Sequence, residues 1–386
     1  MRLHVSRSPV TGMGQAGTGT VERVLVVGPL CLLFLCVPSL KLLAQIDTST
    51  AVLVPEALVE SQIRVLTLDK VPEVIAKAAD GDLEAQCILG IAYSDGTVLP
   101  HDNQEALKWL TKAAPRGVPW VQVRLAAMYH NGRGVERNDG EAVKWYQAAA
   151  VQHEPKAENS LAYMYFKGYG VSQDYAKASQ WYRAAAEQGH AGAQNNLGEM
   201  HQHGFGLPRD YAQALIWYRK AAQTGSAAAA NNLGSMYEAG AGVQKDLSEA
   251  FRWYEAAAAK GEPVGQSNLA YMYAHGQGVH ADLTMATDWY RRSAKQGYAP
   301  AQAQLAQMYA SGKGVPLDYI SAYFWFMTAA GNGHHASKDA ARELVKIMTS
   351  KQRQEAERRL AEERPTEDKA DAVLVDKRLS SYVLKP

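Results

Sequence analysis

The sequence predicts an all-α protein: a right-handed α-α superhelical solenoid of seven 36-residue helix-turn-helix repeats with helical caps. Three observations carry this prediction: a period, a helical spacing of apolar residues, and glycines that separate the helices. Tryptophans recur at a constant step of 36, at Trp109, Trp145, Trp181, Trp217, Trp253, Trp289 and Trp325. A fixed period of about 20 to 50 residues is the signature of stacked repeats that share one continuous core.

The N-terminal region, residues 1–44, is predicted to be a signal peptide or an N-terminal anchor. Residues 24–37 form an apolar run with arginines upstream, and the run is short for a comfortable membrane span. Cleavage is expected after Ala44, although Leu42 is larger than the small residue preferred at that place, so an uncleaved anchor stays open. Met13 is an alternative start.

Residues 45–83 are predicted to form a linker and N-terminal capping helices. We expect a short helix near Pro55 to Val65, and from Pro72 the sequence already follows the repeat at half strength. The seven full repeats are placed at residues 84–335.

The fifth repeat shows how each unit is built. Leu233 and Met236 lie at helical spacing and predict a first helix, which Gly240 ends. Asp246 is placed to cap a second helix, with Glu249 completing a capping box. The equivalent position in the other units is occupied by Asp102, Asp174, Asp210, Asp282 and Asp318, with Asn138 as the one substitution.

Two positions of the second helix are predicted to hold neighbouring units together. Small residues allow the helix backbones to approach closely: Ala106, Ala142, Ala178, Ala214, Ala250, Ala286 and Ala322. The recurring tryptophan is predicted to fill the gap between units. Truncating a buried tryptophan costs roughly 3 to 5 kcal/mol, so the seven copies should carry much of the fold.

After Gly333 the period ends. Residues 336–364 are predicted to form two amphipathic C-terminal capping helices, separated by a capping box of Thr349 and Gln352. Their charged outer faces suit the end of a solenoid. Residues 365–386 are expected to form a flexible tail.

Composition excludes some classes of partner. The formal net charge is +1, and no stretch of the repeats is dominated by Lys and Arg, so a nucleic-acid partner is not expected. Of three cysteines, Cys31 and Cys36 lie in the predicted leader. Cys87 would then be alone and could not form an intrachain disulfide.

At these residues the chain resembles the Sel1-like repeat family, which is related to the tetratricopeptide repeats. The resemblance rests on one line of residues: Asn196-Leu197-Gly198, Gly204-x-Gly206, Asp210 to Ala214, Trp217-Tyr218 and Ala221-Ala222. It implies a non-enzymatic platform for protein complexes, often at the bacterial envelope or in a secretory route. Three departures are local: Val98 replaces the second glycine in unit one, His153 replaces a glycine, and His201 replaces a tyrosine.

No residue is predicted to be catalytic, to bind a cofactor or to ligate a metal, and the chain is not expected to be an enzyme. His201 and His203 are two residues apart and would point to opposite sides of a helix, so a solvated turn explains them better than a metal site. Cys87 is expected near the groove, as a buried and inert thiol or as a reactive one.

The partner-binding groove is predicted from tetratricopeptide superhelices, in which first helices line the concave face. By this analogy nine side chains project into the groove: Asn159, Tyr163, Phe166, Asn195, Glu199, Gln202, Asn231, Glu238 and Tyr271. Asparagines can bind an extended backbone through donor and acceptor, and exposed aromatic residues can anchor a partner.

The sequence thus favours an exported scaffold of the bacterial envelope or periplasm that binds a protein or extended peptide in its groove. The alternatives are a peptidoglycan- or glycan-binding or weakly hydrolytic envelope protein, and an adaptor of the endoplasmic reticulum. Membrane association is expected only through an uncleaved leader. The oligomeric state and the partner are left open.

Overall fold

The computed structural model describes residues 54–363. These residues are helical with turns and contain no strand. The predicted leader and the predicted tail lie outside the described residues. The described part begins with α1 (Glu56–Val65), the 3-10 helix η3 (Leu68–Lys70) and α2 (Val71–Ala79).

Seven helix pairs follow, in agreement with the predicted solenoid of repeats. The first helices of the units are α3 (Leu83–Asp95), α5 (Pro119–Asn131), α7 (Pro155–Lys167), α9 (Ala191–His203), α11 (Ala227–Ala239), α13 (Pro263–His275) and α15 (Ala299–Ser311). The second helices are α4 (Asn103–Ala113), which continues into η4 (Ala114–Arg116), α6 (Asp139–Ala150), α8 (Tyr175–Glu187), α10 (Tyr211–Gln223), α12 (Leu247–Ala259), α14 (Leu283–Lys295) and α16 (Tyr319–Gly331).

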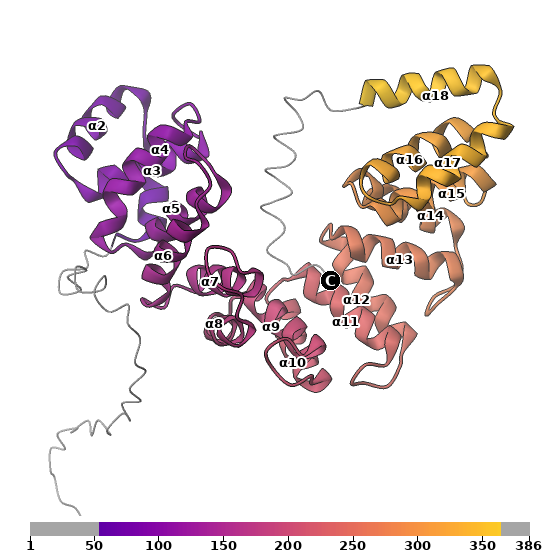
Figure 1. The fold of residues 1–386 in the computed structure, drawn as a ribbon, viewed down its shortest axis with the longest axis horizontal. Helices are drawn as coiled ribbons and strands as arrows, with labels where there is room; N and C mark the ends of the chain where they lie inside the picture. Colours follow the sequence, from indigo (N-terminus) through magenta and orange to yellow (C-terminus); the bar gives the residue numbers. More distant parts are fainter. Residues whose placement is uncertain (1–53, 364–386) are drawn as a thin grey trace, which may run out of the picture. The chain divides into compact units, whose positions relative to one another are not determined.

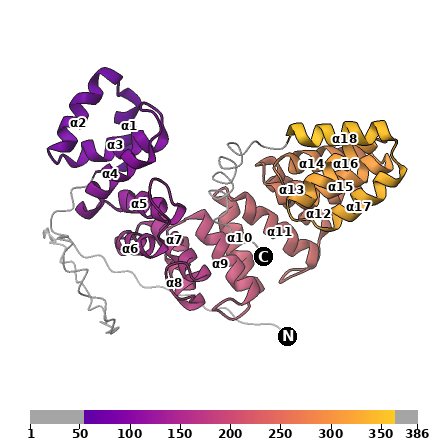
Figure 2. The ribbon, with the colours of Figure 1, turned by 45° about the horizontal axis from the view of Figure 1, so that its top comes forward.

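Each helix packs on its neighbours in the chain. A first helix packs most extensively on the second helix of its own unit, and next on the second helix of the unit before. The pairs α9 and α10, and α11 and α12, lie side by side in Figures 1 and 2. Because contacts are mainly with sequence neighbours, the architecture is that of an all-α solenoid.

An aspartate or asparagine caps the second helix in every unit, as the sequence predicts. In unit five, Oδ1 of Asp246 accepts hydrogen bonds from the backbone N–H groups of Ser248 and Glu249, at 2.9 and 3.0 Å. The predicted reciprocal bond from Glu249 is wrong, because the N–H of Asp246 donates to the carbonyl of Tyr237 at 3.0 Å. Glu249 pairs with Arg252 instead.

The two glycines of the turn between the helices have different tasks. The first, Gly240, ends α11 in the left-handed conformation with φ of 70°. The second, Gly242, also has positive φ, and a Cβ there would come within 2.6 Å of Tyr211 at the start of the preceding second helix. Unit one has Val98 at this second place, and the unit has only the half-repeat with α2 before it. The second glycine is therefore needed where a complete unit precedes.

Unit two keeps the turn at its exit although His153 replaces glycine. His153 has φ of 61°, while Gly189 and Gly225, its equivalents, have φ of 89° and 103°. A left-handed backbone is unfavourable for a residue with a Cβ. The unit thus accepts local strain and retains the same connection.

The deepest aromatic residue is not the recurring tryptophan. Trp109 and Trp217 are buried, but the other five are only half-buried, so the predicted uniform burial is wrong for them. The residue after the tryptophan is buried in every unit: Leu110, Tyr146, Tyr182, Tyr218, Tyr254, Tyr290 and Phe326. The small alanines of the second helices are fully buried, as predicted. The tryptophans still pack between units, since Trp181 contacts two successive core clusters.

After the last pair, the chain forms α17 (Ala336–Ile347) and α18 (Ser350–Glu363). The predicted capping box between them is confirmed. The backbone N–H of Gln352 donates to Oγ1 of Thr349 at 3.2 Å, and the N–H of Thr349 donates to Oε1 of Gln352 at 2.9 Å. Both helices pack on α16 and cover the end of the repeats.

Candidate interaction surface

The nine predicted groove residues lie in three environments. Four are buried against neighbouring helices: Asn159, Phe166, Asn195 and Glu199. Four are half-buried: Tyr163, Gln202, Asn231 and Glu238. Tyr271 is 40% exposed. The expectation that Phe166 is an exposed anchor is therefore wrong. The role of these residues in partner binding stays a prediction.

The asparagines join successive first helices. Nδ2 of Asn232 donates to Oδ1 of Asn195 at 3.0 Å, and Nδ2 of Asn268 donates to Oδ1 of Asn231 at 2.8 Å. Asn196 makes the same bond to Asn159 at 3.3 Å. These amides satisfy one another where the helices bury them, so their first task is to hold the stack together.

Gln202 and Glu238 serve buried tyrosines of their own units. The hydroxyl of Tyr218 donates to Oε1 of Gln202, and the hydroxyl of Tyr254 donates to Oε2 of Glu238, both at 2.7 Å. A buried tyrosine hydroxyl needs such an acceptor. A polar residue at this place in the first helix thus accepts a hydrogen bond from a core tyrosine, whether or not it also contacts a partner.

Glu199 is the most unusual of the nine. It is 8% exposed, and its Oε1 accepts from Nδ2 of Asn195 at 2.9 Å and from Nδ2 of Asn232 at 3.4 Å. Burial raises the pKa of Glu199 to about 8, against the opposing effect of the two amides and of Lys167. At neutral pH most of this carboxyl is therefore protonated.

Aromatic side chains surround the end of α7. Phe166 packs against Tyr175 and Phe205, with ring centroids 4.9 and 5.6 Å apart. Tyr163 meets Tyr169 edge-on at 6.0 Å. Nζ of Lys167 lies 6.0 Å from the ring centroid of Tyr163 and 5.4 Å from that of Phe166.

Tyr169 and Phe205 were not predicted to take part in this cluster. Both lie between the two glycines of the turn that joins the helices of a unit. In the other units with two glycines this position holds a residue that is not aromatic: Arg133, Ala241, Gln277 and Lys313. The departure from the repeat was the signal that could have found them. It is informative because the turn itself does not require an aromatic residue.

Tyr271 lies on α13, two units further along the chain than Tyr163. Its ring packs on His275 with centroids 4.1 Å apart. A leucine recurs on the first helices, at Leu161, Leu197, Leu233, Leu269 and Leu305. We define the first-helix face as the side chains two positions after it: Tyr163, Glu199, Ser235, Tyr271 and Gln307. Ser235, Tyr271 and Gln307 are exposed.

The two histidines near the turn of unit four differ from the predicted solvated pair. His201 is buried, whereas the tyrosines at its place in the other units are half-buried, and burial lowers the pKa of His201. Its ring nitrogens have no hydrogen-bond partner within residues 54–363. His203 is exposed and stacks on Phe205 with centroids 5.5 Å apart.

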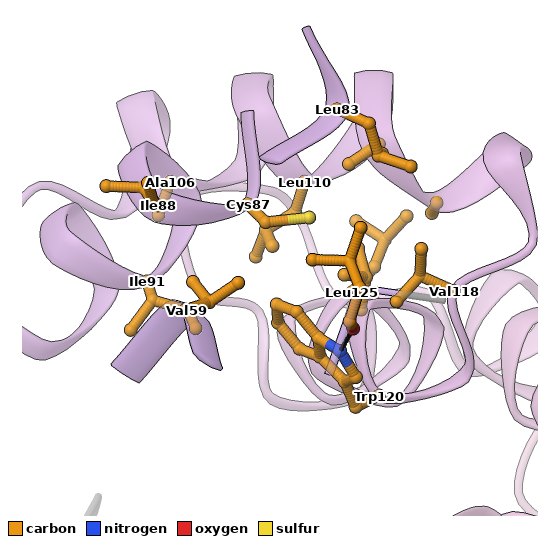
Figure 3. Close-up of a cluster of buried hydrophobic side chains, with 14 of the residues drawn as sticks. Val59, Leu83, Cys87, Ile88, Ile91, Ala106, Leu110, Val118, Trp120 and Leu125 are labelled. Atoms are coloured by element: carbon orange, nitrogen blue, oxygen red, sulfur yellow. Dashed lines mark hydrogen bonds between the residues drawn. The ribbon is translucent and has the colours of Figure 1, made fainter. Parts of the chain in front are cut away.

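Cys87 lies inside the first hydrophobic core, next to Leu110 and Leu125 (Figure 3). Burial raises the pKa of its thiol to about 12. The thiolate is the reactive form of cysteine, so this thiol is unreactive in the folded chain. Of the two possibilities for Cys87, the buried and inert thiol describes it.

The repeats offer neither a metal site nor a membrane span within residues 54–363. In this range, no group of three or more His, Cys, Asp or Glu side chains could hold a metal ion. None of the helices in the same range combines the length and the apolar character needed to cross a membrane.

Comparison with known proteins decides the family. The Sel1 repeat profile matches seven consecutive segments: 83–117, 121–152, 155–190, 191–226, 227–262, 263–298 and 299–334. The chain belongs to the Sel1 repeat family. Sel1 repeat proteins generally mediate protein–protein interactions, and the Sel1 repeat fold is typically a non-enzymatic scaffold.

The solved structure of a Sel1 repeat protein agrees with this assignment. The crystal structure of a Sel1 repeat protein from Oxalobacter formigenes is 32% identical, with a TM-score of 0.59, and the match covers 78% of this chain and 83% of that chain. A protective antigen present in uropathogenic Escherichia coli strains, which displays an SLR fold, is 27% identical with a TM-score of 0.32, covering 74% of this chain and 84% of that one. Among curated proteins, none matches the chain significantly.

Proposed function

We propose that this Sel1 repeat chain is a non-enzymatic scaffold that binds a protein or an extended peptide on the first-helix face. Most first-helix side chains are committed to the fold, because they fill the core or hydrogen-bond to neighbouring helices. On the first-helix face, Ser235, Tyr271 and Gln307 are exposed and therefore available to a partner. A partner that lies along this face would contact several units at once.

The single observation that carries the proposal is the exposure of Tyr271. Within residues 54–363 it is the one large hydrophobic side chain that is exposed on a first helix of the repeats. Tyrosine is enriched among the residues that dominate binding energy at protein interfaces. Tyr163 occupies the same position in unit three and supports the proposal, since its ring is half-buried among other aromatic rings.

The test compares variants of the full chain. The double variant Tyr163→Ala, Tyr271→Ala should weaken binding of a partner captured from the native envelope by about tenfold or more. Ile216→Ala is the matched control, because Ile216 is also an exposed apolar residue but lies on a second helix. Circular dichroism should show the same helix content in all three proteins.

Calorimetry with the purified partner then gives the affinities. Equal affinities of the double variant and the native chain would place the binding site elsewhere. A similar loss with Ile216→Ala would show that the effect is not specific to the first-helix face. Phe166 is left unchanged in this experiment, because it is buried and its truncation would disturb the core.

We also propose that the protein works in the periplasm or cell envelope of a bacterium. The apolar run at residues 24–37 supports export, and it lies outside the described residues. Fractionation of cells that produce the full chain, followed by N-terminal sequencing, tests this. Recovery from the cytoplasm with the apolar run intact would contradict it.

A further inference from the structure

A buried carboxyl group lies on the first-helix face without an ionic partner. Oε1 of Glu199 on α9 is held by Asn195 of the same helix and by Asn232 of α11. Lys167 of α7 favours the charged form of Glu199, but no ion pair joins these two side chains among the described residues. The hydrogen bonds of Glu199 thus join α9 to α11, and α7 is the first helix of the preceding unit (Figures 1 and 2).

The fold does not require an acid at this position. The equivalent residues in the other units are uncharged: Ile91, Ala127, Tyr163, Ser235, Tyr271 and Gln307. Burying a carboxyl group costs free energy unless it is paired or accepts good hydrogen bonds. At this position the repeat accepts the cost in one unit only, so the acid has a reason other than stacking.

The surroundings of Glu199 suit a cation. Tyr163 takes the position of Glu199 in the preceding unit, and both residues raise the pKa of the buried Tyr182. The chain's own ammonium group, on Lys167, already lies over the rings of Tyr163 and Phe166. Aromatic faces attract cations, and a carboxylate beside such a face strengthens the attraction.

We propose that Glu199 receives a lysine or arginine side chain of the partner protein, one unit along the first-helix face from Tyr163. This rests on the proposed function, since it specifies the chemistry of a partner on the first-helix face. On binding, the O–H bond of protonated Glu199 breaks, the proton passes to solvent, and the carboxylate forms an ion pair with the incoming cation. Asn195 and Asn232 stay on Oε1, and the cation approaches Oε2.

The pH dependence of binding follows from the groups around Glu199. These groups are Lys167 from α7, Tyr182 from α8, Tyr218 from α10 and the neutral amide of Asn232 from α11. Both tyrosines keep their protons well beyond neutral pH, because burial raises their pKa. Affinity for the cation should therefore rise by roughly tenfold per pH unit below pH 8 and level off above it.

The experiment uses the full ¹⁵N-labelled chain and two peptides. One is acetyl-Ala-Ala-Lys-Ala-Ala-amide, and the other carries norleucine in place of lysine, which keeps the length and removes the charge. The side-chain amide signals of Asn195 and Asn232 report binding. The lysine peptide should bind about tenfold more tightly than the norleucine peptide at pH 8.

Three variants define the site. Glu199→Gln keeps the shape and should reduce the affinity of the lysine peptide to that of the norleucine peptide. Glu187→Gln is the control, because it removes one exposed charge from α8 and should change nothing. Lys167→Met removes the internal cation and should tighten lysine binding by about threefold. The unliganded amide spectra show whether each variant is folded.

The inference fails if the two peptides bind equally, if neither binds, or if Glu199→Gln leaves their ratio unchanged. Its failure can be told from failure of the proposed function. Loss of partner binding in the variant of Tyr163 and Tyr271, together with equal affinities for the two peptides, would keep the scaffold and remove the cation site. Lysine binding that depends on Glu199, together with unchanged partner binding in the variant of Tyr163 and Tyr271, would keep the cation site and contradict the proposed function.

Discussion

Gly198 on α9 faces the ring of Tyr218 on α10 so closely that a Cβ at residue 198 would come within 2.7 Å of that ring. Gly234 and Tyr254 stand in the same relation in the next unit. In units two, three and six an alanine occupies the glycine's place and a tyrosine is again buried on the second helix. The small residue on the first helix thus makes room for the most deeply buried side chain on the second.

Gly198→Val should lower the free energy of unfolding by roughly 2 kcal/mol, because overfilling a packed core forces neighbours to shift. Gly198→Ala is the matched comparison and should cost less than valine. Its Cβ also forces the buried ring of Tyr218 to shift, as in unit three with Ala162 and Tyr182, but the better helix propensity of alanine, about 1 kcal/mol, offsets part of that cost. Urea unfolding followed by circular dichroism measures both. A larger loss for alanine than for valine would contradict this account.

Tyr182→Ala should destabilise the chain more than Trp181→Ala. Tyr182 is fully buried, whereas Trp181 is half-buried. The cost of truncating a buried aromatic residue is roughly 3 to 5 kcal/mol, and a half-buried one should cost about half as much. The midpoints of thermal unfolding of the two variants give the order. The reverse order would restore the tryptophan to the leading role that its periodicity predicts.

His153→Gly should stabilise the chain by about 1 kcal/mol. It would remove a left-handed conformation that is unfavourable for histidine, at a turn where the other units use glycine. The ion pair that the substitution removes is weak, since Nδ1 of His153 lies 3.7 Å from Oε1 of Glu158 and the histidine side chain is exposed. His153→Ala provides the comparison, because alanine keeps the strain and should bring no gain. Equal stability of the glycine and alanine variants would rule out backbone strain as the cause.

The stability of the native chain should fall as pH rises toward 8, through Glu199. Burial raises the pKa of Glu199 to about 8 in the folded chain, so the folded state holds a proton that the unfolded state releases near pH 4.5. The contribution is fully present below pH 4.5 and is lost progressively as pH rises through 8.

Glu199→Gln should therefore gain roughly 1 to 3 kcal/mol relative to the native chain between pH 6 and pH 9. The measurement is denaturant unfolding at both pH values, with Glu187→Gln as the control for net charge. An identical pH dependence of the native chain and Glu199→Gln would show that Glu199 titrates normally.

Much of the fold follows from local patterns. The 36-residue period, the capping residues and the left-handed glycines act over short distances along the chain, so they identify the helices and their order. The same patterns also explain why Val98 and His153 stand out. The depth of burial does not follow from them. Trp181 and Tyr182 both belong to positions that recur along the repeats, and only their directions from the helix decide which one reaches the centre.

The candidate site was only partly predictable for a related reason. Asn159 and Asn195 recur at the same place, and recurrence alone cannot separate a groove residue from one that bonds to the next helix. That choice depends on contacts between residues 37 apart, such as Asn232 with Asn195. Sequence also could not show that Phe205 joins Phe166, since the two rings meet across neighbouring units.

The sequence by itself determined the repeat, the number of units and the helix pairs, because each unit is specified by residues close together in the chain. The tertiary structure decided which side chains are available to a partner. Stacking buries Asn195 and Phe166, leaves Tyr271 exposed, and encloses the carboxyl of Glu199 between amides from two helices. These outcomes arise from contacts between units, and a linear pattern does not contain them.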